Sequence, residues 1–179
     1  MRFLVLSAIF LNFSYIAQAE TKANSEQEYI PYAYEVMDKF KREVREQLGL
    51  VCIGDGERMS RDVDQIQIIL QGPYEVTVKE ARELHVKCTE KLALLMNTDE
   101  KIRPFLRKYP ADHENASVSI SFKEKVNRAP LISDVCSVFE ARNKIFYNRR
   151  ERESGHLTSI KEEPYEEAVK IVHGSGSAN

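Results

Sequence analysis

The sequence predicts an α+β protein, with a single antiparallel sheet of about five strands and helices packed on one face. In three segments apolar residues recur every three or four positions, which indicates amphipathic helices. Other segments alternate apolar and polar residues, or are short apolar runs bounded by turn residues, which indicates strands. The strands come in blocks with short connections instead of alternating singly with helices, and this arrangement is typical of antiparallel pairing.

Helices are predicted at residues 31–48, 78–96 and 164–172. The first is followed by Gly49, which suits the left-handed residue that commonly ends a helix. The second opens with Thr77-Val78-Lys79-Glu80, a capping box that satisfies backbone N–H groups at the start of a helix. The third is short and carries a single apolar stripe.

Strands are predicted at residues 50–53, 65–70, 117–122, 135–140 and 144–148. In "SVSISF" three apolar residues alternate with three serines, so this strand has one buried face and one small, polar face. The last two strands are predicted to form a hairpin, because Asn143 in the connection between them readily adopts positive φ. Residues 150–163 are polar and are predicted to be a loop.

The stretch "VCIGDGERMSRDVDQ" places two glycines around Asp55. A phosphate-binding loop needs four residues between its glycines and a Lys after the second. A calcium loop needs acidic residues at alternate positions and a Glu at the twelfth. Neither pattern is present. The stretch from Gly54 to Asp64 is therefore predicted to be a charged connection, with its glycines serving backbone geometry. No metal and no cofactor is predicted.

The N-terminus is typical of a cleaved secretory signal peptide over residues 1–19. A positive residue precedes a short apolar run, and Ala17-Gln18-Ala19 forms a cleavage site before Glu20. The run is shorter than the roughly 20 residues of a membrane span, and no later stretch resembles one. We therefore expect export to the periplasm or beyond, a single domain over residues 20–172, a flexible tail over 173–179, and no transmembrane segment after cleavage.

The chain has three cysteines, Cys52, Cys88 and Cys136. In an oxidising compartment one pair could form a disulfide and leave one thiol, and the sequence leaves all three pairings open. Their apolar neighbours suit buried thiols equally well. A Cys88 thiolate activated by His85, three residues earlier on the predicted helix, is disfavoured because Cys88 lies on the apolar stripe. No coherent set of catalytic residues emerges.

The charge is unevenly distributed: residues 101–152 carry 12 Lys and Arg against 6 Asp and Glu. Opposite halves of one fold can simply attract each other, but basic residues interleaved with aromatic ones also form binding surfaces. The candidate surface comprises Arg142, Lys144, Tyr147, Arg149 and Arg150. In an exported protein its target would be an envelope protein, a host protein or an anionic surface, and no nucleic acid is expected.

The segment "TVKEARELHVKCTEKLALLMNTDEKIRPFLRKYP" resembles a pattern found in small exported bacterial proteins, often from intracellular bacteria. That pattern is a capped helix containing "EAR", followed by N-x-x-x-x-I-R-P-x-L-x-x-Y-P. The later "NKIFYNRRE" and "EEPYEEAVKIV" resemble the same set. The resemblance implies a bacterial exported protein. The family has no assigned activity, so the resemblance implies no site residues.

The leading hypothesis is a non-enzymatic exported protein that binds a partner or surface in the cell envelope or beyond. One alternative is a small exported enzyme whose site is assembled from dispersed residues. Another is an oligomeric structural or assembly protein that associates through the serine-faced strand, provided that this strand lies at a sheet edge.

Overall fold

The computed structural model describes residues 28–59, 61–72, 76–123, 135–151 and 154–174. Over these ranges the chain forms three α-helices, a short 3₁₀-helix and six strands in a single mixed sheet. The predicted α+β class with a single sheet is therefore confirmed. The predicted signal peptide, its cleavage site between Ala19 and Glu20, and the tail beyond residue 174 lie outside the described residues.

The helices form where the apolar periodicity predicts them. They are α2 (Ile30–Leu48), α3 (Val78–Thr98) and α4 (Tyr165–Gly174), with the 3₁₀-helix η1 at Arg103–Phe105. Gly49 ends α2 with φ 66°, and the capping box starts α3, where the Thr77 N–H donates to the Glu80 carboxylate (2.8 Å). Because α4 runs to Gly174, residues 173 and 174 belong to a helix and not to the predicted tail.

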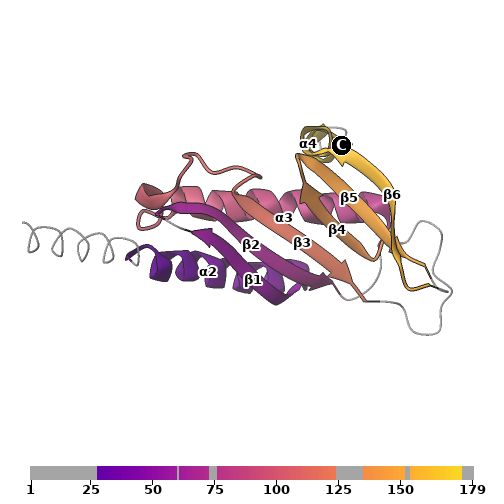
Figure 1. Cartoon of the computed structure of the whole chain (residues 1–179), viewed down its shortest axis with the longest axis horizontal. Helices are drawn as coiled ribbons and strands as arrows, with labels where there is room; N and C mark the ends of the chain where they lie inside the picture. Colours follow the sequence, from indigo (N-terminus) through magenta and orange to yellow (C-terminus); the bar gives the residue numbers. More distant parts are fainter. Residues whose placement is uncertain (1–27, 60, 73–75, 124–134, 152–153, 175–179) are drawn as a thin grey trace, which may run out of the picture.

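The six strands lie in the sheet in the order in which they occur in the chain (Figure 1). They are β1 (Val51–Met59), β2 (Val63–Gly72), β3 (Ala116–Phe122), β4 (Ser137–Ala141), β5 (Lys144–Arg150) and β6 (Leu157–Pro164). Every neighbouring pair is antiparallel except β2 and β3, which are parallel. This pair is parallel because the chain returns to the same end of the sheet through α3. The sixth strand, β6, occupies the second half of the segment predicted to be a loop, so that part of the prediction is wrong.

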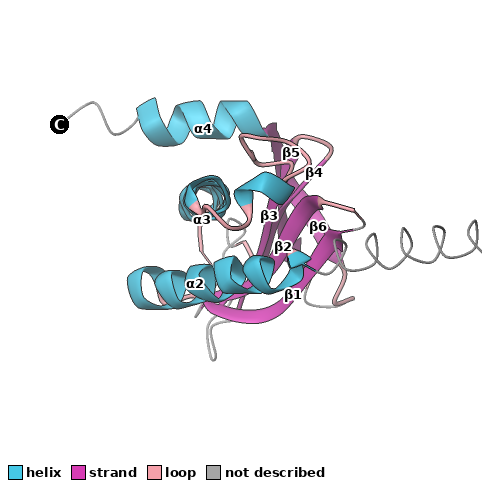
Figure 2. Ribbon diagram, turned by 90° about the vertical axis from the view of Figure 1, so that its left-hand side faces the viewer, coloured by secondary structure: helices cyan, strands magenta, loops and turns pink. Residues whose placement is uncertain are grey.

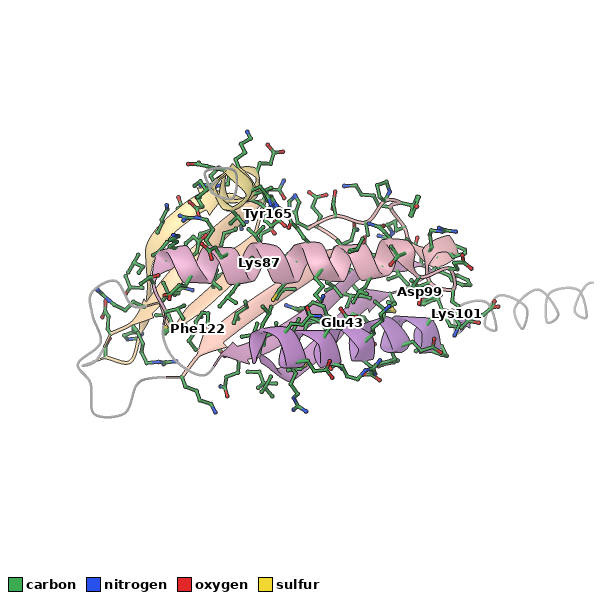
Figure 3. All side chains as sticks on the ribbon, turned by 180° about the vertical axis from the view of Figure 1, so that it is seen from behind. Glu43, Lys87, Asp99, Lys101, Phe122 and Tyr165 are labelled. Carbon is green, nitrogen blue, oxygen red and sulfur yellow. The ribbon has the colours of Figure 1, made fainter. Side chains whose placement is uncertain are left out.

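All three helices lie on one face of the sheet (Figure 2), and α3 lies between α2 and α4 (Figure 3). The core fills the space between the helix layer and this face. Ile66, Ile68 and Leu70 of β2 point into it and are fully buried. Burying an aliphatic side chain of this size stabilises the fold by about 1.5–3 kcal/mol. None of the helices in the described ranges is both long and apolar enough to cross a membrane.

The glycines of "GDG" lie within β1, so the prediction of a loop from Gly54 is wrong. Gly54 and Gly56 pair with Ile69 and Gln67 of β2, and neither has positive φ. Asp55 lies between them and pairs with Lys41 of α2 (2.7 Å). The Asp55 side chain therefore links β1 to α2, and the two glycines lie within a strand and not in a turn.

The serine-faced strand β3 lies inside the sheet, between β2 and β4. Its serines are half-buried on the face away from the helices, while its alternate residues are buried under α3. The oligomer hypothesis required this strand at a sheet edge, and that condition is not met.

Candidate functional site: a cleft at one end of the sheet

A cleft of about 480 Å³ opens at the end of the sheet where β3 begins. It is formed by the end of β1, the start of β2, the connection from η1 to β3 with the start of β3, and the end of β4 with the turn that follows. All of the residues that line it except Ala141 are charged or polar. The lining residues are Arg58, Asp64, Gln65, Arg107, Lys108, His113, Glu114, Asn115, Ser117, Glu140, Ala141, Arg142 and Asn143.

The connection before β3 is fixed by side-chain amides. Asn97 of α3 makes two hydrogen bonds with the backbone of Ala111, at 2.8 and 2.7 Å. The Asn115 amide donates to the Asp64 carbonyl oxygen (2.8 Å), which joins the connection to β2. The side chains that this segment presents to the cleft are therefore held on a defined backbone.

Arg142 lies on a tight two-residue turn. Arg142 and Asn143 both have positive φ, 53° and 61°. Positive φ at both central residues defines a type I′ turn, whose twist matches that of the strands it joins. The Arg142 guanidinium makes no hydrogen bond or ion pair with any described residue, although it lines the cleft.

The other cationic side chains of the cleft, apart from the histidine, already have carboxylate partners. Arg58 pairs with Asp64, Arg107 with Asp62 (2.9 Å) and Asp64 (3.4 Å), and Lys108 with Asp112 and Glu114 (3.4 Å). Because these pairs are largely exposed, each contributes at most about 1 kcal/mol to stability. The carboxylates of these pairs nevertheless neutralise the positive charges of Arg58, Arg107 and Lys108, which an incoming anion would otherwise neutralise.

His113 is held from two sides. Its Nδ1 lies 2.6 Å from the Glu140 Oε1. Its ring stacks on Tyr165, the first residue of α4, with ring centroids 4.1 Å apart. The hydrogen bond to Glu140 raises the pKa of His113 above its usual value, and partial burial opposes this only in part. The remaining nitrogen, Nε2, makes no hydrogen bond to another described residue.

Behind Tyr165 lies a second histidine, His85 of α3. Its ring meets Tyr165 edge-on at 6.4 Å and is fully buried. Neither ring nitrogen of His85 has a hydrogen-bond partner of normal geometry, and the same is true of the buried Thr89 hydroxyl one turn further along. Burial lowers the pKa of His85 to about 4, so its imidazole is neutral at neutral pH.

The five residues of the predicted basic surface do not form one patch. Arg142 and Lys144 lie at one end of β5, and Arg149 and Arg150 lie at the other, roughly 20 Å away at the usual rise per strand residue. Only Arg142 lines the cleft, while Lys144 pairs with Glu162 (3.2 Å). Tyr147 does not belong to the surface at all, because its side chain is fully buried.

Tyr147 instead belongs to a buried ionic cluster under α3. Arg82 donates two hydrogen bonds to Glu163, at 2.6 and 3.0 Å, and the Tyr147 hydroxyl donates to the same carboxylate. Lys161 reaches it from the surface (2.9 Å). Burial alone would raise the pKa of Glu163, but these donors outweigh it and hold the pKa at about 2. No local sequence pattern distinguishes Glu163 from its exposed neighbours.

The structure forms no disulfide. Cys52, Cys88 and Cys136 are all thiols, so none of the three possible pairings is present. Cys88 is buried under the helix layer, which raises its thiol pKa to about 12. Cys52 is only half-buried, on edge strand β1.

Sequence reasoning found one residue of the cleft, Arg142, and missed the pair formed by His113 and Glu140. These two are 27 positions apart and belong to different elements, so no local motif could reveal them. Within the described ranges, no group of three or more His, Cys, Asp and Glu side chains could hold a metal ion. Comparisons with protein-family models, with curated proteins and with solved structures find no match to this chain, so its cleft is interpreted from its own chemistry.

Proposed function

We propose that this chain is an exported, non-enzymatic binding protein whose cleft recognises an anionic group on a partner in the cell envelope or beyond. One observation carries the proposal: Arg142 lies at an exposed position of a tight turn, lines the cleft and has no partner among the described residues. A guanidinium in this position offers a planar pair of donors that matches a carboxylate or phosphate group. The signal-peptide pattern and the resemblance to small exported bacterial proteins support export.

Charge reversal tests the binding role. The Arg142→Glu variant should lose most of the binding of the protein to envelope extracts, measured by cosedimentation. The matched control is Lys144→Glu, in the same hairpin but outside the cleft lining, and it should bind nearly as well as the native protein. Equal binding by Arg142→Glu and the native protein would remove the cleft from the proposal.

Export has its own test. When the full chain is expressed in a bacterium, the protein recovered from the periplasm or the medium should begin at Glu20, as N-terminal sequencing would show. Protein retained in the cytoplasm with residues 1–19 intact would contradict export without affecting the cleft.

A second candidate function, a small exported enzyme, is favoured by the His113–Glu140 pair. A carboxylate that orients a histidine and stabilises its charged form is a common arrangement in general acid–base catalysis. His113, however, has no hydrogen bond to a hydroxyl or thiol among the described residues. Activity on ester, amide or phosphoester substrates that disappears in His113→Gln and persists in Lys144→Ala would favour the enzyme over the binding protein.

A further inference from the structure

We propose that an oxyanion, either a carboxylate or a phosphate group, binds in the cleft between Arg142 and the protonated imidazole of His113, so that proton uptake switches binding on. This inference rests on the proposed function and adds the ligand class and its regulation. It follows from which hydrogen-bond donors of the cleft remain available.

Two cationic groups that line the cleft can still accept an anion. Arg142 has no partner among the described residues, and His113 uses only one of its two ring nitrogens. Arg58, Arg107 and Lys108 are engaged by neighbouring carboxylates. An anion that recruited one of these three would have to displace its carboxylate, whereas Arg142 and His113 require no such exchange.

Protonation reverses the chemical role of the free nitrogen of His113. In the neutral ring, the proton on Nδ1 is donated to Glu140, and Nε2 carries a lone pair that repels an anion. In the protonated ring, Nδ1–H still donates to Glu140, and Nε2–H becomes a donor with positive charge behind it. The hydrogen bond to Glu140 therefore persists through the change, and only Nε2 changes, from a hydrogen-bond acceptor to a donor.

The groups around His113 favour proton uptake by His113 and not by the neighbouring His85. Glu140 of β4 faces it directly, and Asp112 and Glu114 of its own connection add negative charge nearby. Tyr165 of α4 stacks on it, and His85 of α3 lies beyond that ring. The carboxylates raise the pKa of His113, while burial keeps His85 neutral down to about pH 4.

A carboxylate and a phosphate group are both oxyanions, and two probe molecules distinguish between them. Sulfate is a tetrahedral dianion that resembles a phosphate group but does not titrate near neutral pH. N-acetylglycine carries a single carboxylate that stays ionised over the same range. Because carboxylates already line the cleft, we expect the singly charged probe to bind at least as tightly as the dianion.

The experiment titrates the mature protein, without its signal peptide, with each probe at about pH 5.5 and about pH 8, followed by NMR signals of Arg142 and His113. We expect roughly tenfold tighter binding at the lower pH, as one added charged hydrogen bond supplies. Arg142→Ala should abolish binding at both values, and Lys144→Ala should leave both affinities unchanged. His113→Gln should bind equally at both values.

Glu140→Gln provides a second variant in case His113→Gln disturbs the stack. It removes the charge that raises the pKa of His113, so the switch should move to lower pH. If probe binding requires Arg142 but does not depend on pH, the switch is overturned and the proposed function stands. If neither probe binds at either pH, or if binding survives Arg142→Ala, the site itself is overturned.

Discussion

The imidazole of His113 lies nearly parallel to the phenol ring of Tyr165, with centroids 4.1 Å apart and an angle of 12° between the planes. Tyr165 starts α4, and His113 belongs to the connection that lines the cleft. The stack therefore joins the last helix of the fold to the candidate site. Tyr165 and Ala168 are the buried residues of α4, and Val169 and Val172 are partly buried against the core, so this contact is one of those that hold the helix in place.

Replacing Tyr165 with Ala should lower the free energy of unfolding by about 3–5 kcal/mol, because it removes a large ring from between two histidines. Tyr165→Phe keeps both ring contacts and should change stability by less than about 1 kcal/mol, because the hydroxyl has no partner among the described residues. Urea denaturation of the two variants gives both values. If Tyr165→Ala and Tyr165→Phe lowered the free energy of unfolding by similar amounts, the ring contacts of Tyr165 would not account for its stabilising effect.

His85 should make the protein less stable in acid. Its pKa is about 4 in the folded protein, below the ordinary value near 6.5, so the unfolded chain takes up a proton more readily. Its contribution is complete above about pH 6.5 and is lost as pH falls toward 4, with a loss of about 2 kcal/mol at pH 5. His113 acts in the opposite direction: its raised pKa stabilises the fold below its ordinary pKa, and this stabilisation is lost as pH rises through the folded pKa.

The contribution of His85 to the pH dependence of stability is distinguished from that of His113 by urea denaturation of the native protein and of His85→Leu at about pH 5 and pH 7.5. The native protein should lose more stability on acidification than the variant, by about 2 kcal/mol. His156→Gln, at an exposed position, is the control and should follow the native protein. Identical pH profiles for the native protein and His85→Leu would show that the His85 site admits water.

The buried pair of Arg82 and Glu163 should show strong coupling in a double-mutant cycle. Arg82→Met or Glu163→Gln alone leaves a buried group without its partner and should cost about 3–5 kcal/mol. The double variant should cost less than the sum of the two single variants, because neither charge then remains buried. The exposed pair Lys144–Glu162 is the control, and its cycle should give a coupling below about 1 kcal/mol. Additive losses at Arg82 and Glu163 would argue that water reaches the pair.

Gly72 and Gly56, both in strands, should respond oppositely to alanine. A Cβ at Gly72 would lie 2.6 Å from the Phe122 ring, so Gly72→Ala should cost about 1–3 kcal/mol as the ring shifts. At Gly56 the nearest atom is a Gln67 side-chain oxygen at 3.7 Å, and Gly56→Ala should be neutral or stabilising by up to about 1 kcal/mol. Thermal or urea denaturation measures both. A stable Gly72→Ala variant would mean that Phe122 has room to move.

The thiols should react in the order of their burial. Three thiols should be counted in the denatured protein, because no disulfide is present. In the native protein Cys52 should react first, whereas burial and a pKa of about 12 protect Cys88. Mass spectrometry after brief alkylation identifies the modified residue. A count of one thiol in the denatured protein would establish a disulfide in solution.

Local patterns predicted the helices and most strands because each depends on neighbours in the chain. The apolar repeat before Gly49, the capping box at Thr77 and the alternation in "SVSISF" all specify structure within a few residues. The strand β6 was missed because its buried residue is Glu163, so its sequence shows no alternation of apolar and polar residues. Burial of that residue depends on its partners, above all on Arg82, 81 positions away.

Local patterns could not predict the parallel pairing of β2 with β3 either, because the sequence of a strand does not indicate the direction of the strand beside it. The cleft follows from that pairing, since it brings the start of β3 beside the start of β2. Arg142 was identified because it belongs to a local run of basic and aromatic residues. His113 and Glu140 were not, because only the assembled sheet places them together.

The chain-order arrangement of the sheet has a consequence for how the protein reaches its native state. Most strands pair with the strand that immediately precedes them across a short connection, whereas β2 meets β3 only after the chain closes a loop that includes α3. Loop closure and sequence-distant contacts slow folding, so joining the two antiparallel halves is expected to be the late step. Substitutions in the paired residues of β2 and β3, such as Ile68→Val, should then slow refolding less than they speed unfolding, as stopped-flow kinetics can show.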